Sequence, residues 1–336
     1  MKKQRFSTYF NNWLYGKDGY YTKYKAIGKD GDFFTAVSTS IFFGGSIAKK
    51  IVDTILNNEL PKNTTIVEIG AHHGYLLADI IQFIYTLNPK LLESLNFAIV
   101  ERFENLKNEQ KKYLENSFGD SIKFDFYDDI SEIKLDHAFI VANEIYDAFS
   151  CELIYTKDNK LQTAFVEKGE IQFKDCSDEN IINKCKKYKI TKGELALGYE
   201  EFAKNICENI KNFYFLSFDY GEKYPRNDFS CRIYSKHEVF PIFDEKLDLT
   251  KLYKNSDITY DVNFSHVIDS FNSFCKCEVE YQTQLKALVE FGILDLLEIL
   301  QKNVSEENYL KEVQKVKTLL EPTGMGDRFK MLLIKK

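Results

Sequence analysis

The sequence predicts an α/β fold built on a doubly wound, mostly parallel sheet. Short apolar runs each predict a strand, at residues 64–70, 95–101, 121–127, 137–144 and 213–221. Between the first three runs, apolar residues recur at helical spacing over 74–87 and 103–117. Strands that are apolar throughout are typical of parallel sheets with helical crossovers. Because such crossovers are right-handed, we expect a ligand crevice at the carboxyl ends of the strands.

The segment before this alternation is expected to be a separate layer. Residues 1–60 are aromatic-rich and helical in pattern, and we expect an N-terminal helical cap that carries the loop GDFFT (31–35). Residues 61–336 are expected to form the core. No Pro- or Gly-rich linker divides the chain, so one domain with appendages fits better than two domains.

Two insertions are expected in the core, at about 151–210 and 285–325. The first begins with short antiparallel strands, marked by the turn sequences DNK and KGE. The second is helical and lies between two strand-like segments, 277–284 and 328–336. These two segments predict a hairpin, so the final strand of the sheet should be antiparallel.

Composition excludes several classes of protein. The chain has 336 residues, with 45 basic and 51 acidic side chains and a net charge of −6. This balance argues against a general nucleic-acid binder, which needs a basic excess. The N-terminus lacks the apolar core of a signal peptide, and no stretch reaches the roughly 18 apolar residues of a membrane span. We therefore expect a cytoplasmic protein without nucleic-acid or membrane partners; its oligomeric state cannot be read from the sequence.

The seven cysteines are odd in number and scattered, with no C-x-x-C pair. A reducing cytoplasm is the simplest interpretation. Cys275 and Cys277, with His266 nearby, could be a fragment of a metal site. Zinc sites need four ligands at more regular spacing, so we expect no metal.

The segment VEIGAHHGYL (67–76) has the form of a cofactor-binding turn between a strand and a helix. Gly70 allows the backbone to turn sharply, and Gly74 allows close contact where the helix begins. The middle position of the usual glycine pattern is His72. Its Cβ makes φ > 0 more costly than for glycine, although histidine tolerates that region better than most residues. The turn is altered but a cofactor is not excluded.

Acidic residues follow the next two strands. Glu101 is placed to bind ribose hydroxyls, or is a solvated glutamate at a helix start. Asp128 and Asp129 follow the third strand, where an acid could hold an adenine amine. Asp129 could equally be a helix N-cap, and the sequence leaves both alternatives open.

The fourth strand ends in the most unusual set of polar residues, Asn143, Glu144 and Asp147. Burying such groups is costly unless they are paired or used, so capping alone is the less favoured explanation. Asp219 adds an acid after the next strand. Several acids at one rim would attract a cationic group of a substrate, such as a guanidinium.

At these residues the sequence resembles the MidA-like family of class I methyltransferases, which includes a mitochondrial complex I assembly factor that methylates a protein arginine. GDFFTAVSTSIFFG (31–44), VEIGAHHGYLLADI (67–80) and IVANEIYDAF (140–149) are similar to successive motifs of the family. FDYGEKY, CRIYSKH, DITYDVNF and MGDRFKMLLI follow in the family's order. Seven motifs in order cover almost the whole chain.

The resemblance implies a class I methyltransferase (Rossmann-like) fold and S-adenosyl-L-methionine as the cofactor. It implies that Asn143, Glu144 and Asp147 lie beside the methyl group or the nucleophile. The residues expected to bind the cofactor come from the cap loop and the strand ends: Gly31, Asp32, Thr35, Glu68, Gly70, His72, Gly74, Glu101 and Asp129.

The chain departs from the family pattern at several positions. Ala71 and His72 replace a proline and a glycine, and Val37-Ser38 replaces Pro-Glu in the cap loop. Asp261 and Asn263 replace a histidine and an aspartate. The resemblance thus implies a methyltransferase acting on a protein arginine. The alternative is a catalytically weak or inactive protein of the same fold that acts as an assembly or scaffold factor. Methylation of a small molecule is not separable from the first hypothesis.

Overall fold

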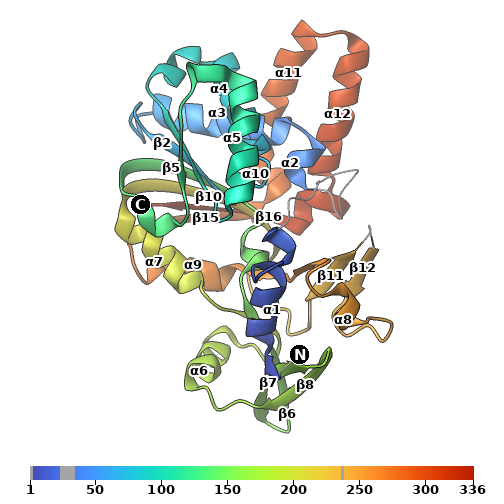
Figure 1. The fold of residues 1–336 in the computed structure, drawn as a ribbon. Coiled ribbons are helices and arrows are strands. Elements are labelled where there is room, and N and C mark those ends of the chain that lie inside the picture. Colours follow the sequence, from blue (N-terminus) through green and yellow to red (C-terminus); the bar gives the residue numbers. More distant parts are fainter. Residues whose placement is uncertain (1–2, 23–34, 236–237) are drawn as a thin grey trace. The chain divides into compact units, whose positions relative to one another are not determined.

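The protein is described by a computed structural model that covers residues 3–22, 35–235 and 238–336 (Figure 1). The chain forms two compact units. Unit 1 comprises Met1–Phe33, Ile145–Lys204 and Tyr220–Ser273, and unit 2 comprises Phe34–Glu144, Asn205–Asp219 and Phe274–Lys336. These boundaries differ from the division into cap and core expected at residue 60, because the chain passes between the units several times.

Unit 2 contains the parallel sheet that the sequence predicts. Its strands are β2 (Thr65–Ile69), β3 (Asn96–Val100), β4 (Phe124–Tyr127), β5 (Leu135–Asn143), β10 (Ile210–Glu222), β15 (Glu278–Thr283) and β16 (Phe329–Lys335). The order is β15-β16-β10-β5-β2-β3-β4, and β10 runs on past Asp219 into unit 1. The five strands from β4 to β10 are parallel to their neighbours.

The last strand is antiparallel, as predicted. β16 pairs with β15 in antiparallel register. On its other side, Phe213 and Lys336 exchange both backbone N–H···O bonds, at 3.1 and 3.0 Å. Such a reciprocal pair is the mark of an antiparallel ladder. The sheet is therefore mostly parallel with an antiparallel final strand, which confirms the predicted fold class.

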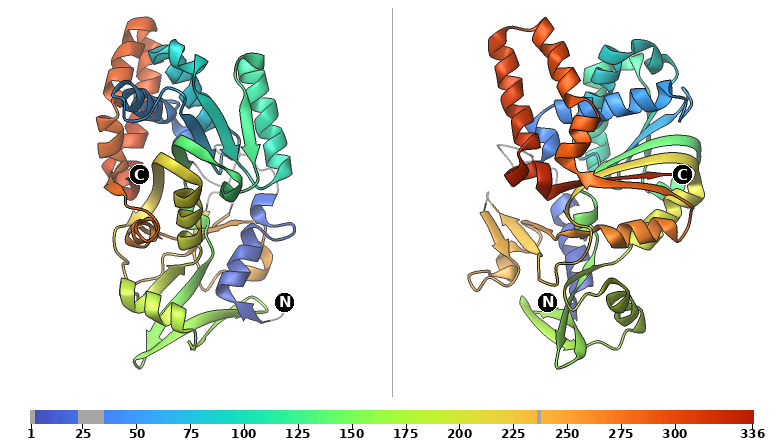
Figure 2. Two further views of the ribbon diagram at one scale, coloured as in Figure 1. Left: turned by 90° about the vertical axis from the view of Figure 1, so that its left-hand side faces the viewer. Right: turned by 180° about the vertical axis from the view of Figure 1, so that it is seen from behind.

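Among the described residues, the α-helices that lie wholly within unit 2 are α2 (Ala36–Thr39), α3 (Phe42–Leu56), α4 (Tyr75–Leu87), α5 (Glu104–Phe118), α10 (Gln284–Glu290), α11 (Ile293–Asn303) and α12 (Glu306–Leu320). Short 3-10 or π turns span Pro89–Glu93, Gly119–Ser121, Ile130–Glu132 and Pro322–Gly326. The helical insertion forms the α11–α12 hairpin, which is orange-red in Figure 2. Alternate residues of the strands, such as Phe139 and Val141 of β5, join these helices in one buried cluster. The period of two therefore selects the packed face.

Unit 1 is built from smaller sheets and shorter helices. One sheet has the order β1-β7-β6-β9, with β8 beside β7, and a second has the order β12-β11-β13. The strands are β1 (Gln4–Arg5), β6 (Cys151–Lys157), β7 (Lys160–Glu167), β8 (Glu170–Asp175), β9 (Lys192–Ala196), β11 (Arg232–Ser235), β12 (Glu238–Pro241), β13 (Asp257–Thr259) and β14 (Val262–Asn263). The antiparallel strands predicted after residue 151 are thus confirmed as β6–β8.

The helices of unit 1 are α1 (Phe6–Leu14), α6 (Glu179–Tyr188), α8 (Leu249–Leu252) and α9 (Phe264–Asn272), with turns at Tyr20–Thr22 and Tyr146–Ala148; α7 (Tyr199–Asn209) continues into unit 2. Helix α1 buries its aromatic residues inside the unit. Tyr9 and Trp13 are fully buried, and the indole N–H of Trp13 donates to the carbonyl of Ser256 at 2.6 Å. Within the described residues, no helix has the length and apolar character needed to cross a bilayer.

The contact between α3 and α4 depends on a glycine. A Cβ on Gly44 would lie 2.6 Å from the Cβ of Asp79, which is fixed to the backbone of α4. We therefore expect Gly44→Ala to lower the free energy of unfolding by about 2 kcal/mol, even though alanine is the better helix former. Urea unfolding measures the change. Leu56→Ala, at a side chain that is 53% exposed on the same helix, should cost far less; equal losses would contradict the role given to Gly44.

Candidate functional site

The register of the parallel sheet brings five strand ends to one edge of unit 2. Ile69 of β2 pairs with Val100 of β3 and with Ala142 of β5. Val100 in turn pairs with Tyr127 of β4, and Asn143 pairs with Phe218 of β10. The residues that follow these positions therefore share an edge: Gly70, Glu101, Asp128, Glu144 and Asp219. Parallel α/β sheets bind ligands at this edge, and the strands that form it are labelled in Figure 1.

The loop after β2 is a run of left-handed backbone. Gly70 has φ 72°, His72 has φ 46°, and Gly74 has φ 78° as the N-cap of α4. The N–H of Gly74 closes the turn onto the carbonyl of Ala71 at 2.7 Å. His72 therefore adopts the conformation that its Cβ makes costly. The turn therefore keeps a backbone path with positive φ at Gly70, His72 and Gly74, although His72 replaces a glycine.

Glu68 ties the sheet to the start of α4. Its side chain is buried, and its Oε2 accepts a 3.1 Å hydrogen bond from the backbone N–H of Leu77, in the first turn of the helix. Those first N–H groups have no partner within a helix, so an acceptor from the strand satisfies one of them. Burial raises the pKa of Glu68 to about 8, and the nearby Asp79 carboxyl adds to this rise. Glu68 thus positions the loop.

Gln110 joins the loop to the end of β3. This α5 side chain is fully buried, and its Nε2 donates to the carbonyl of His72 at 3.0 Å and to Oε2 of Glu101 at 3.4 Å. The other oxygen of Glu101 accepts from the N–H of Phe103 at 3.0 Å. Burial raises the pKa of Glu101, although these hydrogen bonds oppose the rise. Glu101 is therefore not the solvated surface glutamate that the sequence left open.

Three buried polar atoms at this edge lack partners among the described residues: Gln110 Oε1, His72 Nδ1 and Asn143 Oδ1. The amide orientation of Gln110 is fixed because its Nε2 faces two acceptors. Asn143 is fixed in the same way, since its Nδ2 donates to Oε1 of Glu144 at 2.9 Å. Burial lowers the pKa of His72 to about 3, with His73 contributing, so its imidazole is neutral. Buried groups without partners indicate a ligand or water between them.

These atoms fit the donors of a nucleoside with an amino acid attached. Two amide oxygens, a buried carboxyl and a neutral imidazole nitrogen can accept hydrogen bonds from hydroxyl and ammonium groups. Gly70 and Gly74, both at positive φ, have no side chain that would keep a ligand away from the turn. The described residues of unit 2 therefore fit S-adenosyl-L-methionine.

Glu144 stands at a second strained position. It follows β5 with φ 54°, and its N–H donates to the carbonyl of Phe218 at 2.8 Å. A positive φ in a residue with a Cβ costs of order 1 kcal/mol and is common at functional sites. Asp219, which the sequence also placed at this rim, is fully buried.

The remaining predicted cofactor residues have local roles or lie outside the described residues. Asp129 is exposed and accepts from the N–H of Ser131 at 2.9 Å, so the capping alternative is realised. Asp128 pairs with Lys107. Thr35 and Ser38 form a reciprocal capping box at the start of α2, so Ser38 has a structural role where the family has an acid. Gly31 and Asp32 lie outside the described residues.

Asp147 belongs to a polar network in unit 1. It is buried and accepts a short hydrogen bond from the hydroxyl of Tyr220. Burial raises the pKa of Asp147 to about 6, against the hydrogen bond from Tyr220 and the charge of Arg232. The guanidinium of Arg232 lies 4.6 Å from the centre of the Tyr220 ring. An acid with this pKa can hold or release a proton near neutral pH.

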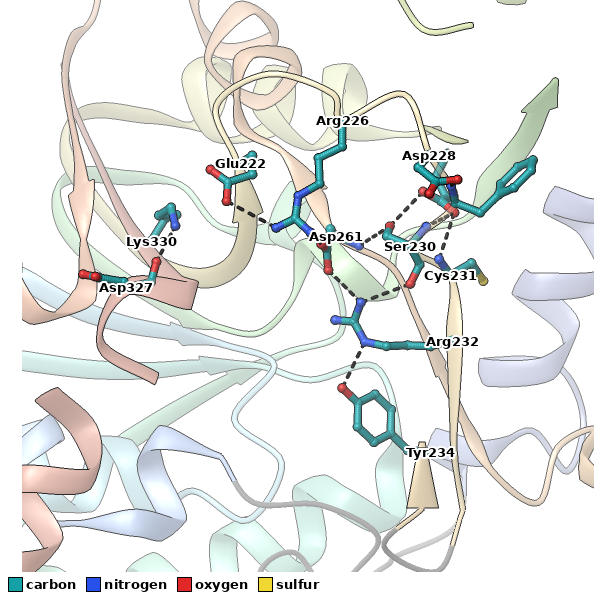
Figure 3. A network of polar contacts seen from close by, with 12 residues as sticks. Glu222, Arg226, Asp228, Ser230, Cys231, Arg232, Tyr234, Asp261, Asp327 and Lys330 are labelled. Atoms are coloured by element: carbon teal, nitrogen blue, oxygen red, sulfur yellow. Dashed lines mark hydrogen bonds and ion pairs between the residues drawn. The ribbon is translucent and has the colours of Figure 1, made fainter. Parts of the chain in front are cut away.

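Arg232 is fixed by further contacts (Figure 3). Its Nη1 donates to Oδ1 of Asp261 at 2.7 Å, and its Nε donates to the hydroxyl of Tyr234 at 3.0 Å. Its Nη2 is buried without a partner among the described residues. Asp261, which replaces a histidine of the family pattern, thus neutralises a buried cation.

Sequence reasoning missed Gln110 as a site residue. It lies in the middle of the expected helix 103–117, in no motif, and only the fold turns it toward His72 and Glu101. Tyr220 and Arg232 lie in the motifs FDYGEKY and CRIYSKH, but the sequence alone did not indicate a role for either residue. The arginine of C-R-I-Y and the tyrosine of D-Y-G were the available signals.

The fold and the polar groups at the sheet edge fit a class I methyltransferase that uses S-adenosyl-L-methionine. A model of the family described as "Putative S-adenosyl-L-methionine-dependent methyltransferase" matches residues 46–283, more than half of the chain. The chain belongs to this family.

Individual relatives agree with this assignment. The mitochondrial protein arginine methyltransferase NDUFAF7 of Danio rerio is 20% identical over 94% of this chain and 79% of its own length. A Burkholderia thailandensis protein solved with bound S-adenosyl-homocysteine matches with a TM-score of 0.84 and 20% identity, over 99% of this chain and 88% of its own. A native structure of a protein from that organism gives 0.81 and 19%, over 99% and 87%. At these identities the solved structures support the fold alone.

Glu68 should make stability depend on pH. Its pKa is about 8 when folded and 4.5 when unfolded, so the folded state binds more protons between these values. Stability contributed by this group is therefore present below pH 4.5 and is lost as pH rises through 8. Glu68→Gln should raise the free energy of unfolding by about 1 kcal/mol or more at pH 8.5 and change it little at pH 5, in urea unfolding. The exposed Glu109→Gln should show no such difference; a gain equal at both pH values would contradict the assignment.

Gln110 should be needed for cofactor binding. Gln110→Met keeps the apolar volume but removes the bridge from His72 to Glu101 and the unpartnered oxygen. We expect S-adenosyl-homocysteine to bind about tenfold more weakly, the loss of roughly one buried hydrogen bond. Calorimetric titration measures this, with Glu109→Gln on the exposed side of α5 as the control. Unchanged affinity of the Met variant would show that Gln110 serves only the loop.

Proposed function

We propose that this methyltransferase transfers the methyl group to an arginine side chain of a protein. The observation that carries the proposal is the pair of carboxyl groups at the sheet edge of unit 2, Glu144 and Asp219, which follow the last paired residues of the neighbouring strands β5 and β10. A guanidinium is planar and cationic, and carboxylates recognise it through charge-assisted hydrogen bonds. The named activity of the fish relative, over most of both chains, supports the same acceptor.

The residues have two kinds of proposed role: binding the methyl acceptor and accepting a proton from it. S-adenosyl-L-methionine supplies an activated methyl group on a sulfonium. Methyl transfer needs alignment of nucleophile, carbon and sulfur more than acid–base chemistry. Glu144, whose carboxylate is oriented by the amide N–H of Asn143, is proposed to hold the acceptor. On the sequence motif alone, which places it three residues after Glu144, Asp147 is proposed to take the proton that leaves the methylated guanidinium; its pKa near 6 suits that role.

The cofactor residues are proposed on the same basis. Gln110 and Asn143 offer amide oxygens, His72 offers a neutral nitrogen, and Glu101 takes the ribose hydroxyls. A protein substrate and a cytoplasmic location stay proposals that rest on the relative's name and on the sequence. The scaffold alternative predicts that the turn no longer binds the cofactor.

Asp147→Asn should separate transfer from binding. The amide keeps the shape but cannot accept a proton, so methyl transfer should fall at least 100-fold. Affinity for S-adenosyl-homocysteine should stay within about threefold. The measurement combines calorimetry with labelled methyl transfer to a protein extract, followed by hydrolysis and chromatography of methylated arginine. Asp136→Asn, at an exposed acid on β5, should retain full activity.

Different results would contradict different parts of the proposal. Label on another amino acid or on a small molecule would overturn the arginine acceptor but not methyl transfer. Full activity of Asp147→Asn would remove Asp147 from the mechanism. Failure of the wild-type protein to bind S-adenosyl-homocysteine at millimolar concentration would favour the scaffold.

A further inference from the structure

Three cysteine sulfurs meet in unit 2. The Sγ atoms of Cys207, Cys275 and Cys277 all lie within 4.8 Å of one another. Cys207 and Cys275 form a disulfide across 68 residues, and the Sγ atoms of Cys275 and Cys277 are 2.8 Å apart. Within the described parts of the chain, no other group of three or more His, Cys, Asp or Glu ligands has this arrangement. A disulfide uses two sulfurs, so it leaves the position of the third unexplained.

The sequence prediction concerned two of these three cysteines. Cys275 and Cys277 were considered as metal ligands with His266, and no metal was expected. His266 lies in unit 1, with its Nε2 3.0 Å from Oε1 of Glu200. The third sulfur comes instead from Cys207, in the last turn of α7. No spacing rule connects positions 207 and 275, so only the fold reveals it.

The backbone around Cys207, Cys275 and Cys277 directs their side chains toward one another. Cys275 and Cys277 flank Lys276 just before β15, and their Sγ atoms lie 2.8 Å apart, so both side chains point to the same side of the chain. The burial pattern agrees, since both cysteines are half-buried while Lys276 is exposed. Cys207 is almost fully buried at 4% exposure. Cys275 and Cys277, from the segment before β15, and Cys207, from the end of α7, thus supply three ligand atoms to one site.

The spacing suits a thiophilic metal ion. Zinc–sulfur bonds of about 2.3 Å in tetrahedral geometry place sulfurs roughly 3.8 Å apart, a separation within the cluster's 4.8 Å limit. Soft thiolates select ions such as Zn²⁺ or Cu(I) over Mg²⁺ or Ca²⁺. Three protein thiolates leave the fourth tetrahedral position for water, which can enter beside the half-buried Cys275 and Cys277.

A fixed cation lies near the cluster. The Nζ of Lys336 donates to the carbonyl oxygens of Cys207 and Ile210, and its charge acts on Cys277. Three thiolates around a divalent ion carry a net charge of −1. The ammonium of Lys336 offsets that charge, so the surroundings favour a trithiolate site.

We propose that Cys207, Cys275 and Cys277, in their reduced form, bind one thiophilic metal ion of the zinc type. Reduction comes first. A phosphine delivers two electrons to the Cys207–Cys275 bond and takes the oxygen of water, whose two protons complete the two thiols. Each thiol then releases its proton to solvent as it binds the metal. The ion joins the end of α7 to the segment before β15, and the disulfide joins the same segments when the site is oxidised.

Cobalt titration of the full chain tests the proposal. Protein reduced with a phosphine, which is then removed, is titrated with Co²⁺ under argon, followed by competition with Zn²⁺ and a chromogenic chelator. We expect one Co²⁺ per chain with intense thiolate-to-cobalt absorption, displaced by Zn²⁺. Cys277→Ser should weaken metal binding at least tenfold. The matched control is Cys176→Ser, at another half-buried free cysteine, which should behave as wild type.

Alkylation of the wild-type protein gives a second measurement that needs no variant. In the reduced protein, Zn²⁺ should slow the modification of Cys275 and Cys277 by N-ethylmaleimide at least tenfold, as mapped by mass spectrometry, and leave the modification of Cys176 unchanged. The proposal is overturned if no charge-transfer absorption develops, or if Cys277→Ser and Cys176→Ser bind metal equally. A Cys207–Cys275 bond that resists reduction in the folded protein also overturns it.

Discussion

The parallel register of β4, β3, β2, β5 and β10 is the constraint on which the rest of unit 2 depends. Because their pairing aligns the carboxyl ends, five loops leave the sheet at one edge. A shift of one residue in any strand would exchange the side chains on its two buried faces and move its loop out of line. The apolar pattern of the strands therefore fixes the core and, through the same pairing, the place of Glu101 and Glu144.

The site combines groups whose charge is suppressed by burial. Glu68 is held near a pKa of 8, and His72 near 3, so both favour the neutral form at neutral pH. Hydrogen bonds from Leu77 and Gln110 then organise the loop without a strong local charge. In unit 1 the polar network contains charged groups instead. Arg232 and Asp261 form an ion pair, and the guanidinium of Arg232 lies over the ring of Tyr220. The cost of burying polar groups is therefore offset in unit 2 by neutral side chains and hydrogen bonds, and in unit 1 by an ion pair.

The sequence predicts local structure well because local structure depends on periodicity. The strand expected at 64–70 is β2 at Thr65–Ile69, and the helix expected at 74–87 is α4 at Tyr75–Leu87. The division into two units was not predicted, because contacts between distant segments define it. The same holds for the site: Glu101 follows from its strand, whereas Gln110 and Cys207 sit in helices whose spacing says nothing about what they face. Charged residues and motifs in the sequence indicate candidate site residues, but only the packing of the fold shows which side chains they contact.

The cofactor turn is held through its main chain. Gln110 donates to the backbone carbonyl of His72, and the N–H of Gly74 donates to the carbonyl of Ala71. Such anchoring depends on the path of the backbone and is indifferent to the side chain at position 72. Any residue that tolerates a left-handed conformation, such as glycine, asparagine or aspartate, can follow that path. Position 72 is thus a place where evolution can vary the chemistry that faces the ligand and leave the architecture intact.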